Sequence, residues 1–597
     1  MRAPLVRLAC LLGLALGAAE VGLRADPRLG LSTQAALTWL GLACGISVAV
    51  LLASALGLYL LVRLAGPRVP AAGWLALAGV TLHGALAWRF DLHSFARISE
   101  PHVWGGLLGI ALGGLAAGAL LDRPLRAAGR GLDAAVLLVF VVGTGAALLR
   151  SLPEDRARRV DPGHPNLVLI TLDTVRADAL SPWNPARDTP AAARLAAEGA
   201  TFEQAVASAP LTEPSHLAML SGQPPHRSGV VANGTVLPAD LGRVPEILRS
   251  AGWKTAAFVS GFPLHARYGW SRGFDVYDDD FGTVPGLHRL SLVRAWDALA
   301  RPAHTLRERR GDRTARRALA WLDTHGRTGP WFLWLHLFDP HGPYEPPPPF
   351  APSRDPVAGG PALGLPAFWP PRWQAVTDAA WLTEAYLGEV RFADAQVGRV
   401  LDHLAASDRL DATAVVLVSD HGESLGEHGY AFDHGDDLYD PSLVVPLLVR
   451  APGRVPPGSR VACQVPTSDL ARTLLDLVGV PGADVPGTSL LPLLQGTCVE
   501  REVVATTVAT RNVADPPVDH ALRSQGFKWI RPEVRPPGLF DLGADPGEVR
   551  DLAPDRPAEA ARLDALLEAR LAGSGPVRAP DAGMATLEAL EALGYLE

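Results

Sequence analysis

From Asn166 onward the sequence predicts an α/β domain, and a helical membrane region precedes it. Short apolar runs alternate with Ala- and Leu-rich helical stretches, which is the pattern of strands and helices in such a domain. The first run, Leu167–Leu172, is unbroken, as expected for a strand buried on both faces of a sheet. Residues 1–150 have a different composition, dominated by long apolar stretches.

The apolar stretches of residues 1–150 predict about five membrane spans, because most reach the ~17–25 residues that a spanning helix needs. They are Leu8–Leu23, Ala35–Val62, Val69–Trp88, Val103–Leu121 and Ala134–Leu149. The first could be a signal peptide, but a cleaved signal seldom precedes so many spans, so an anchor is favoured. Arginines on both sides leave the orientation undecided. With the N-terminus inside, we expect a multi-pass protein of a bacterial inner (cell) membrane whose remaining chain is extracytoplasmic.

The rest of the chain divides by composition. Residues 151–165 are rich in Arg, Asp and Pro and are expected to be a linker. The main domain is expected at residues 166–500, and the short strands beyond it indicate a smaller C-terminal subdomain and tail at residues 501–597. Helices are predicted at Thr189–Glu198, Ala315–Asp323, Ala379–Ala406 and Pro557–Leu571, and further strands at Ala256–Val259, Trp331–Leu337, Ala414–Val418 and Val444–Val449.

The charge distribution argues against a nucleic-acid partner, and the cysteine content leaves open whether a disulfide forms. The net charge is −8, and no basic stripe suggests binding to nucleic acid. Of the four cysteines, Cys463 and Cys498 lie in the predicted soluble part. They could pair if that part is extracytoplasmic, or they could be two buried thiols. Oligomeric state is not indicated by the sequence.

Polar residues end two of the predicted strands. Asp173 follows Leu172, and Asp420-His421 follows the run that ends at Val418-Ser419. In open α/β sheets the chemistry lies beyond the carboxyl ends of the strands, and a carboxylate beside an imidazole there is a metal-ligand pair. The alternatives are an acidic strand cap and a helix cap with a surface histidine.

Thr212 precedes Pro214 at the start of a predicted helix. One interpretation is an ordinary N-cap, with the proline just inside the helix. The other is catalytic, because a helix N-terminus favours anions and a hydroxyl there becomes a nucleophile if a metal or base activates it.

Two carboxylates, an imidazole and a hydroxyl together predict one divalent cation site. The candidate ligands are Asp173, Thr212, Asp420 and His421. Oxygen ligands suit Mg, Ca or Mn, and a histidine shifts the preference towards Mn or Zn. Three further histidines are left to contact an anionic ester, and these are His216, His341 and His434. A second metal could be held by His336, Asp339, His341 and His428.

These segments, in this order, resemble the sulfatase family within the alkaline phosphatase superfamily. The matching segments are LITLDTVRAD at 169–178, LTEPSHLAMLSG at 211–222, FDPHGPYEPP at 338–347, VVLVSDHGE at 415–423, VPLLVRAPG at 445–453 and FDLGADPGEVRDLA at 540–553. The resemblance implies a large mixed sheet flanked by helices, a metal site and attack on a sulfate or phosphate ester.

The chain departs from the family pattern at the residues nearest the chemistry. Thr212 stands where a sulfatase has Cys or Ser oxidised to formylglycine, so no formylglycine is expected. His216 replaces an Arg, Thr174 replaces the second metal Asp, and His421 replaces an Asn. Ser260-Gly261-Phe262 stands where Lys-Trp-His is usual, and His434 replaces a Lys that contacts the ester.

A Thr nucleophile with Asp, Asp and His ligands is similar to the superfamily's phosphodiesterases, lipoteichoic acid synthase and phosphoethanolamine transferases. We therefore expect a membrane-anchored, metal-dependent hydrolase of sulfate or phosphate esters that forms a covalent intermediate on Thr212. His341 and His434 would stabilise the ester oxygens or protonate the leaving group. Sulfated or phosphorylated small molecules, glycans or lipids are the expected substrates.

Two alternatives remain at this stage. One is a phosphoglycerol- or phosphoethanolamine-type transferase of the cell envelope, in which an acceptor alcohol replaces water. The other is a catalytically inactive sulfatase fold that acts as a binding protein, which the lost family residues suggest. The retention of Asp173, Thr212, Asp420 and His421 argues against the inactive form.

Overall fold

A computed structural model describes residues 163–281 and 308–578, except for 328, 367–368, 483, 497, 500 and 509–516. Within these residues no helix combines the length and apolar character required to cross a membrane. The five predicted spans and most of the predicted linker lie outside the described residues, so both stay predictions.

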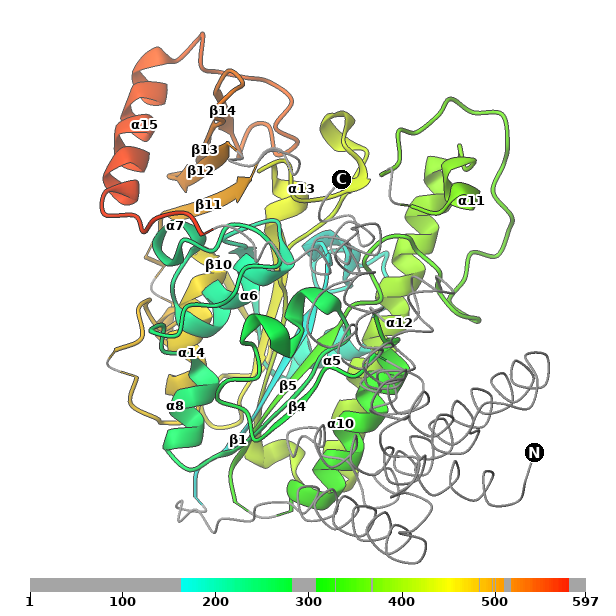
Figure 1. Cartoon of the computed structure of the whole chain (residues 1–597), viewed down its shortest axis with the longest axis vertical. Helices are drawn as coiled ribbons and strands as arrows, with labels where there is room; N and C mark the ends of the chain where they lie inside the picture. The colour runs from blue at the N-terminus through cyan, green and yellow to red at the C-terminus, as the bar shows by residue number, and fades with distance from the viewer. Residues whose placement is uncertain are drawn as a thin grey trace, which may run out of the picture. The chain divides into compact units, whose positions relative to one another are not determined.

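The described residues form a large mixed sheet with order β10-β2-β9-β6-β1-β5-β3-β4 (Figure 1). The strands are β10 (Ser459–Pro466), β2 (Ala200–Val206), β9 (Val444–Arg450), β6 (Thr413–Ser419), β1 (Asn166–Leu172), β5 (Trp331–Leu337), β3 (Lys254–Phe258) and β4 (Val276–Asp278). β9 is antiparallel to both of its neighbours, whereas β6, β1, β5, β3 and β4 are parallel. The prediction of a mixed sheet is confirmed.

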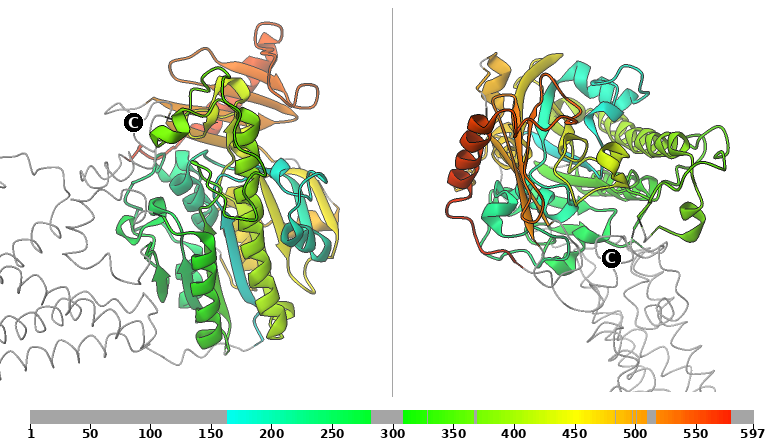
Figure 2. Two further views of the ribbon diagram at one scale, coloured as in Figure 1. Left: turned by 90° about the vertical axis from the view of Figure 1, so that its right-hand side faces the viewer. Right: turned by 90° about the horizontal axis from the view of Figure 1, so that it is seen from above.

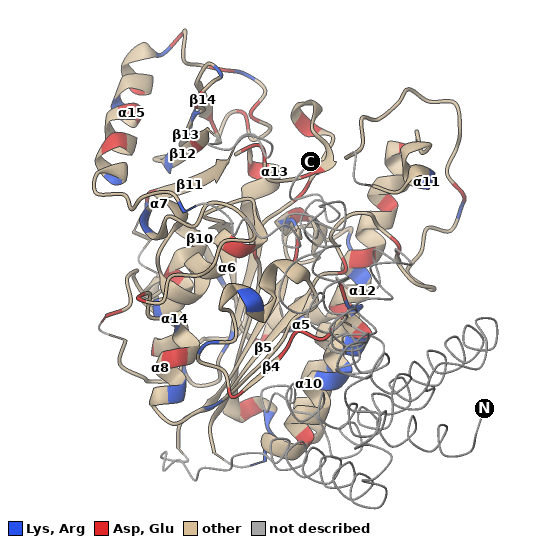
Figure 3. Cartoon of the chain, viewed as in Figure 1, with Lys and Arg blue, Asp and Glu red and all other residues tan. Residues whose placement is uncertain are grey.

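Helices cover both faces of this sheet (Figure 1). One layer contains α5 (Pro190–Glu198), α10 (Gly311–His325) and α12 (Ala379–Ala406), which share a buried core with β1 and β5. The other layer contains α6 (Thr212–Ser221), α8 (Val244–Ser250) and α14 (Leu470–Leu477), which contact one another. Charged residues occur on helices such as α8 and α10, whereas the central strands are mostly uncharged (Figure 3). Apolar burial on both faces of the sheet is the main stabilising term of such a three-layer arrangement.

Shorter elements follow the main strands and helices. They are α7 (Pro225–Ser228), α11 (Pro371–Gln374), α13 (Asp440–Leu443), β7 (Ser424–Leu425) and β8 (Ala431–Asp433). Beyond the large sheet, a separate four-stranded antiparallel sheet contains β11 (Val503–Val508), β12 (Val518–Ser524), β13 (Phe527–Arg531) and β14 (Gly538–Asp541). The last helix, α15 (Pro557–Leu571), lies against this sheet (Figure 2), and Leu563 and Leu567 pack on Leu522 and Trp529.

Most predicted elements are confirmed within a few residues. Trp331–Leu337, Ala379–Ala406 and Pro557–Leu571 have the predicted bounds. Three strands of the large sheet, β2, β4 and β10, were not predicted. β2 contains Glu203 and Gln204, which break the apolar run that identifies a buried strand.

Cys463 and Cys498 form a disulfide, with their Cα atoms 5.7 Å apart. The bond joins β10 to the segment after the 3₁₀ helix Leu491–Gln495 and closes a loop of 35 residues. Of the two alternatives left open by the sequence, the structure therefore has the paired cysteines.

We predict that Cys463→Ser/Cys498→Ser lowers the free energy of unfolding by about 3–4 kcal/mol, because the unfolded chain regains the entropy of this 35-residue loop. Chemical denaturation of the full-length protein, with and without reductant, measures the difference. Reductant should destabilise the wild type but not the double variant; equal stability of both proteins under oxidising conditions would contradict the prediction.

Candidate active site and metal centre

Neighbouring strand ends bring Asp173 and Asp420 together. β1 and β6 are paired in register from Asn166 and Thr413 to Leu172 and Ser419, so the next residues of both strands emerge at one edge. The Asp420 amide donates to the Leu172 carbonyl at 3.2 Å, and the Thr174 amide donates to Asp420 Oδ1 at 3.3 Å. The strand-end prediction therefore identifies two carboxylates that meet in the fold.

Three ligand atoms converge at this edge. Asp173, Asp420 and His421 each offer one atom, and these atoms lie within 4.8 Å of one another. His421 Nε2 is 3.8 Å from Asp173 Oδ1 and 3.6 Å from Asp420 Oδ2. All three side chains are fully buried, and among the described residues these three atoms find no hydrogen-bond partner. Buried polar atoms are rarely left unpaired, so this arrangement fits a divalent cation.

The imidazole of His421 is oriented for metal binding. Its Nδ1 lies 3.0 Å from the Gly422 carbonyl oxygen, which can only accept, so Nδ1 carries the hydrogen. Nε2 then has a lone pair directed at the two carboxylates, as a neutral histidine ligand requires.

Burial sets the electrostatics of the two carboxyl groups. It raises the pKa of Asp173 well above its usual value, as does the charge of Glu423, and a hydrogen bond from the Thr212 side chain opposes the shift. Burial also raises the pKa of Asp420, with the charge of Asp173 as the next cause. A cation bound between the two carboxylates would offset the cost of burying their charges and the repulsion between them.

The structure corrects the predicted position of Thr212 in its helix. Leu211, with extended φ −138° and ψ 141°, occupies the N-cap position, and Thr212 is the first helical residue. Its hydroxyl bonds Asp173 instead of capping the helix. The Glu213 amide donates to Asn233 Oδ1 at 2.8 Å, so a distant asparagine satisfies this end of α6. Thr212 is thus placed beside the three candidate ligands.

His341 and His434 lie next to this group. Their ring centroids are 4.9 Å apart, and the His434 ring is 4.4 Å from that of His421. His341 Nδ1 donates to the Gly342 carbonyl at 2.8 Å, and His434 Nδ1 lies 3.2 Å from Glu423 Oε1. The structure therefore gathers both predicted histidines at the candidate metal ligands.

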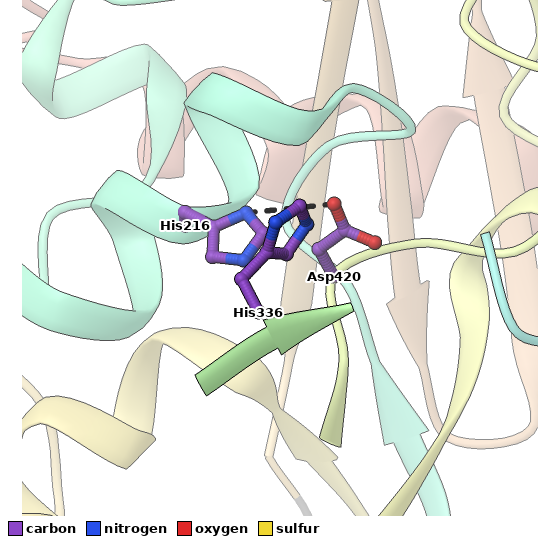
Figure 4. Close-up of side chains that lie close together, drawn as sticks. All are labelled: His216, His336 and Asp420. Carbon is purple, nitrogen blue, oxygen red and sulfur yellow. Dashed lines mark ion pairs between the residues drawn. The ribbon is translucent and has the colours of Figure 1, made fainter. Parts of the chain in front are cut away.

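His216 is placed differently from the expected ester contact. It is fully buried, and its Nδ1 lies 2.8 Å from the Thr212 carbonyl oxygen while Nε2 lies 3.0 Å from Thr171 Oγ1. Figure 4 shows it beside His336 and Asp420. Both ring nitrogens are used within the protein, so the geometry favours support of the site over contact with an ester.

The four residues suggested for a second metal do not form one group in the described part of the chain. Asp339 instead accepts the Gly311 amide at the start of α10 with both carboxylate oxygens. The His428 ring stacks on Tyr439 with centroids 3.6 Å apart. This suggestion is wrong, because spacing along the sequence does not report which way each side chain turns.

Sequence reasoning assigned no role to Thr171, Ser260 or Glu423. Thr171 is a lone hydroxyl within an apolar run, and Glu423 closes the segment VVLVSDHGE, so both carried a signal. Ser260 acts through its backbone amide, which donates to His336 Nδ1 at 3.3 Å, and no side-chain pattern reveals such a contact.

The fold is an α/β domain with a large mixed sheet, and acidic and histidine side chains gather at its strand ends. The family model described as Sulfatase matches residues 165–480, and the model described as N-sulphoglucosamine sulphohydrolase, C-terminal, matches residues 426–574. The chain belongs to the sulfatase family, whose members are ester hydrolases.

Curated sulfatases are similar to this chain in sequence, and solved structures share its fold. Choline-sulfatase of Rhizobium meliloti (strain 1021) is 28% identical over 69% of this chain and 87% of its own length. Arylsulfatase K of Danio rerio is 26% identical over 72% and 87%. The phosphonate monoester hydrolase of Agrobacterium radiobacter has the same fold, with a TM-score of 0.56 and 22% identity over 68% of this chain and 96% of its own.

The buried carboxyl groups predict a pH-dependent response to metal. Burial raises the folded pKa of Asp173 and Asp420 above the unfolded value. Without a cation these groups therefore favour folding at low pH and cost stability as pH rises through the folded pKa. A cation must displace the protons, so its affinity rises with pH.

We predict that Mn²⁺ at about 100 times its Kd at about pH 8 stabilises the full-length protein by about 2.7 kcal/mol at that pH, and that the same Mn²⁺ concentration stabilises it less at about pH 5.5. Thermal unfolding with and without the ion measures this. Asp420→Asn is the matched variant, because it keeps the shape of the side chain and removes its charge. An equal response of wild type and Asp420→Asn at both pH values would exclude this site as the origin.

Proposed function

We propose that this sulfatase-family protein is a metal-dependent hydrolase of a sulfate or phosphate ester, with Thr212 as its covalent nucleophile. The observation that carries the proposal is the Thr212 hydroxyl bonded to Asp173 beside three buried ligand atoms without partners. A hydroxyl next to a bound cation is one of the standard activated nucleophiles.

Asp173, Asp420 and His421 would hold the ion, with Thr212 as a further ligand. When bound, a divalent cation lowers the pKa of a neighbouring hydroxyl and neutralises charge on an ester oxygen. The histidine ligand favours Mn or Zn over Mg or Ca. As a threonine, residue 212 has no route to formylglycine, so no formylglycine is expected.

The reaction proceeds in two displacements on Thr212. After the hydroxyl loses its proton to bulk water, Oγ1 forms a bond to sulfur or phosphorus and the bond to the leaving alkoxide breaks. The leaving oxygen takes a proton from His341 or His434, the two histidines beside the ligands. Water then attacks the sulfur or phosphorus atom and gives a proton to that histidine, while the bond from this atom to Thr212 Oγ1 breaks. Oγ1 takes a proton back from water, which restores the Thr212 hydroxyl, and the acid is released.

Two observations favour different ester types. The curated relatives include enzymes named for sulfated small molecules and glycans, choline-sulfatase and N-acetylglucosamine-6-O-sulfatase, which supports a sulfate ester. A threonine nucleophile supports a phosphorus ester, because the chain lacks the formylglycine precursor that a typical sulfatase uses. If an acceptor alcohol took the place of water, the same intermediate would make the protein a transferase.

The catalytic part is proposed to lie outside the cytoplasm, attached to the membrane by the predicted spans. The disulfide between Cys463 and Cys498 supports this location, because such bonds persist in oxidising compartments. Substrates of a membrane-attached site would include lipid or glycan esters as well as small molecules.

We predict that Thr212→Ala lowers kcat by at least about 10³-fold, because the nucleophile is removed. Full-length protein is assayed against aryl sulfate, aryl phosphate and aryl phosphodiester substrates with Mn, Zn, Mg and Ca in turn. Thr473→Ala is the control, since Thr473 is also a buried threonine near the start of a helix, α14, and should leave kcat within about 3-fold.

Turnover of one ester class that depends on Thr212 and on metal would support the proposal and identify the ester. Mass spectrometry of the quenched reaction should find sulfate or phosphate on the peptide that contains Thr212. Full activity of Thr212→Ala would refute the covalent mechanism. Metal binding by the wild type without turnover of any ester would instead favour an inactive fold that acts as a binding protein.

A further inference from the structure

His216, His336 and Asp420 form a second buried cluster, whose potential ligand atoms also lie within 4.8 Å of one another (Figure 4). All three side chains are fully buried. The cluster shares Asp420 with the candidate metal centre, so it could be a second cation site or a support for the first. The hydrogen bonds of the two histidines distinguish these possibilities.

The ring of His336 has both nitrogens occupied. The Ser260 backbone amide can only donate, and it lies 3.3 Å from His336 Nδ1, so Nδ1 accepts and has no hydrogen. The hydrogen of the neutral ring is therefore on Nε2, which donates to Asp173 Oδ2 at 3.1 Å. A metal at either nitrogen would have to displace one of these bonds.

The ring of His216 is fixed in the same manner. Its Nδ1 donates to the Thr212 carbonyl, although Asp420 Oδ2 is 3.4 Å away. The Trp334 indole donates to Thr171 Oγ1 at 3.0 Å, which leaves the Thr171 hydrogen for His216 Nε2. This chain of donors is fully satisfied, so the cluster is a hydrogen-bonded support and not a second cation site.

We propose that His336 is a positioning residue that fixes the Asp173 carboxylate for metal binding. By holding Oδ2, it leaves Oδ1 turned towards His421 Nε2, the 3.8 Å pair of the candidate centre. This inference rests on the proposed function, because it assumes a cation at Asp173, Asp420 and His421.

The strand arrangement explains why His336 is suited to this role. It lies on β5 directly opposite Thr171 of β1, two residues before Asp173. The rigid sheet therefore fixes the distance between donor and carboxylate. A ligand whose second oxygen is held by a neighbour loses less freedom on binding the ion, and such outer contacts are typically worth 10–100-fold in metal affinity.

The test compares two amides at this position in the full-length protein. In His336→Gln the amide nitrogen reaches the place of Nε2 and can still donate to Asp173. In His336→Asn the amide reaches only the place of Nδ1, so it can meet the Ser260 amide but not Asp173. We expect the Mn²⁺ Kd of His336→Gln within about 3-fold of wild type, and that of His336→Asn raised about 10–100-fold.

Metal affinity is measured by competition with a chelator of known affinity, and bound metal per chain by elemental analysis. Thr413→Val is the control, because it removes a buried hydroxyl at the opposite end of β6, where Thr413 donates to the Arg409 carbonyl. It should lower stability without changing the Kd. Both histidine variants should retain the same number of ions per chain as the wild type.

Each remaining outcome overturns a stated claim. If wild type binds Mn²⁺ and His336→Asn binds it equally well, His336 has no positioning role. If wild type binds two ions and the histidine variants bind one, His336 is a ligand of a second site. If wild type binds no divalent ion, the proposed function fails together with this inference.

Discussion

Two like charges buried beside each other constrain everything else in this site. Asp173 and Asp420 are fully inaccessible to solvent, and burial raises the pKa of both; the charge of Glu423 raises the pKa of Asp173 further, and the charge of Asp173 raises that of Asp420. Burying one unpaired carboxylate is expensive, and burying two at one strand edge requires protons or a cation. His421 Nε2 has a free lone pair, and at 3.8 Å from Asp173 Oδ1 and 3.6 Å from Asp420 Oδ2 it is too far from either carboxyl for a hydrogen bond, which suits a cation between the three atoms. The nucleophilic role proposed for Thr212 requires that a cation, and not protons, neutralises the two carboxylates.

The sheet makes this costly arrangement possible. β5, β1 and β6 lie side by side in the sheet. The last residues of β5 therefore lie at the same edge as the residues that follow β1 and β6. Backbone bonds between Asp420 and Leu172 and between Asp173 and Leu337 hold these ends in register. Because packed strands fix their backbone positions, the candidate ligands are in place before an ion binds. Hydrogen bonds from His336 and His216 in addition orient the groups around them.

The grouping of the candidate ligands at one strand edge was predictable from sequence because its signal is local. An unbroken apolar run that stops at Asp173, and another that stops at Asp420-His421, requires no knowledge of the fold beyond the strand-end rule. The long helix α12 and the strand β5 were equally clear from length and composition. The prediction that the sheet is mixed came from the family resemblance, which rests on whole sequence segments.

What escaped prediction depends on contacts between distant residues. The support of α6 by Asn233, 20 residues from Glu213, leaves no mark in the helix itself. His216 has a plausible sequence context for ester binding, and only its bonds to Thr171 and the Thr212 carbonyl show another environment. β2 escaped because it carries polar residues on a strand at the outer part of the sheet. Sequence patterns predict the strand or helix on which a residue lies, whereas tertiary packing determines which residues its side chain contacts.

The most direct test of the central claim is an anomalous difference map from crystals of the full-length protein grown with Mn²⁺. We predict one peak within bonding distance of Asp173 Oδ1, Asp420 Oδ2 and His421 Nε2, with the Thr212 hydroxyl beside it. The separation of about 2.0–2.2 Å expected for a first-row cation bound to oxygen or nitrogen would complete the assignment. No peak at these atoms, or a peak among His216, His336 and Asp420 instead, would contradict it.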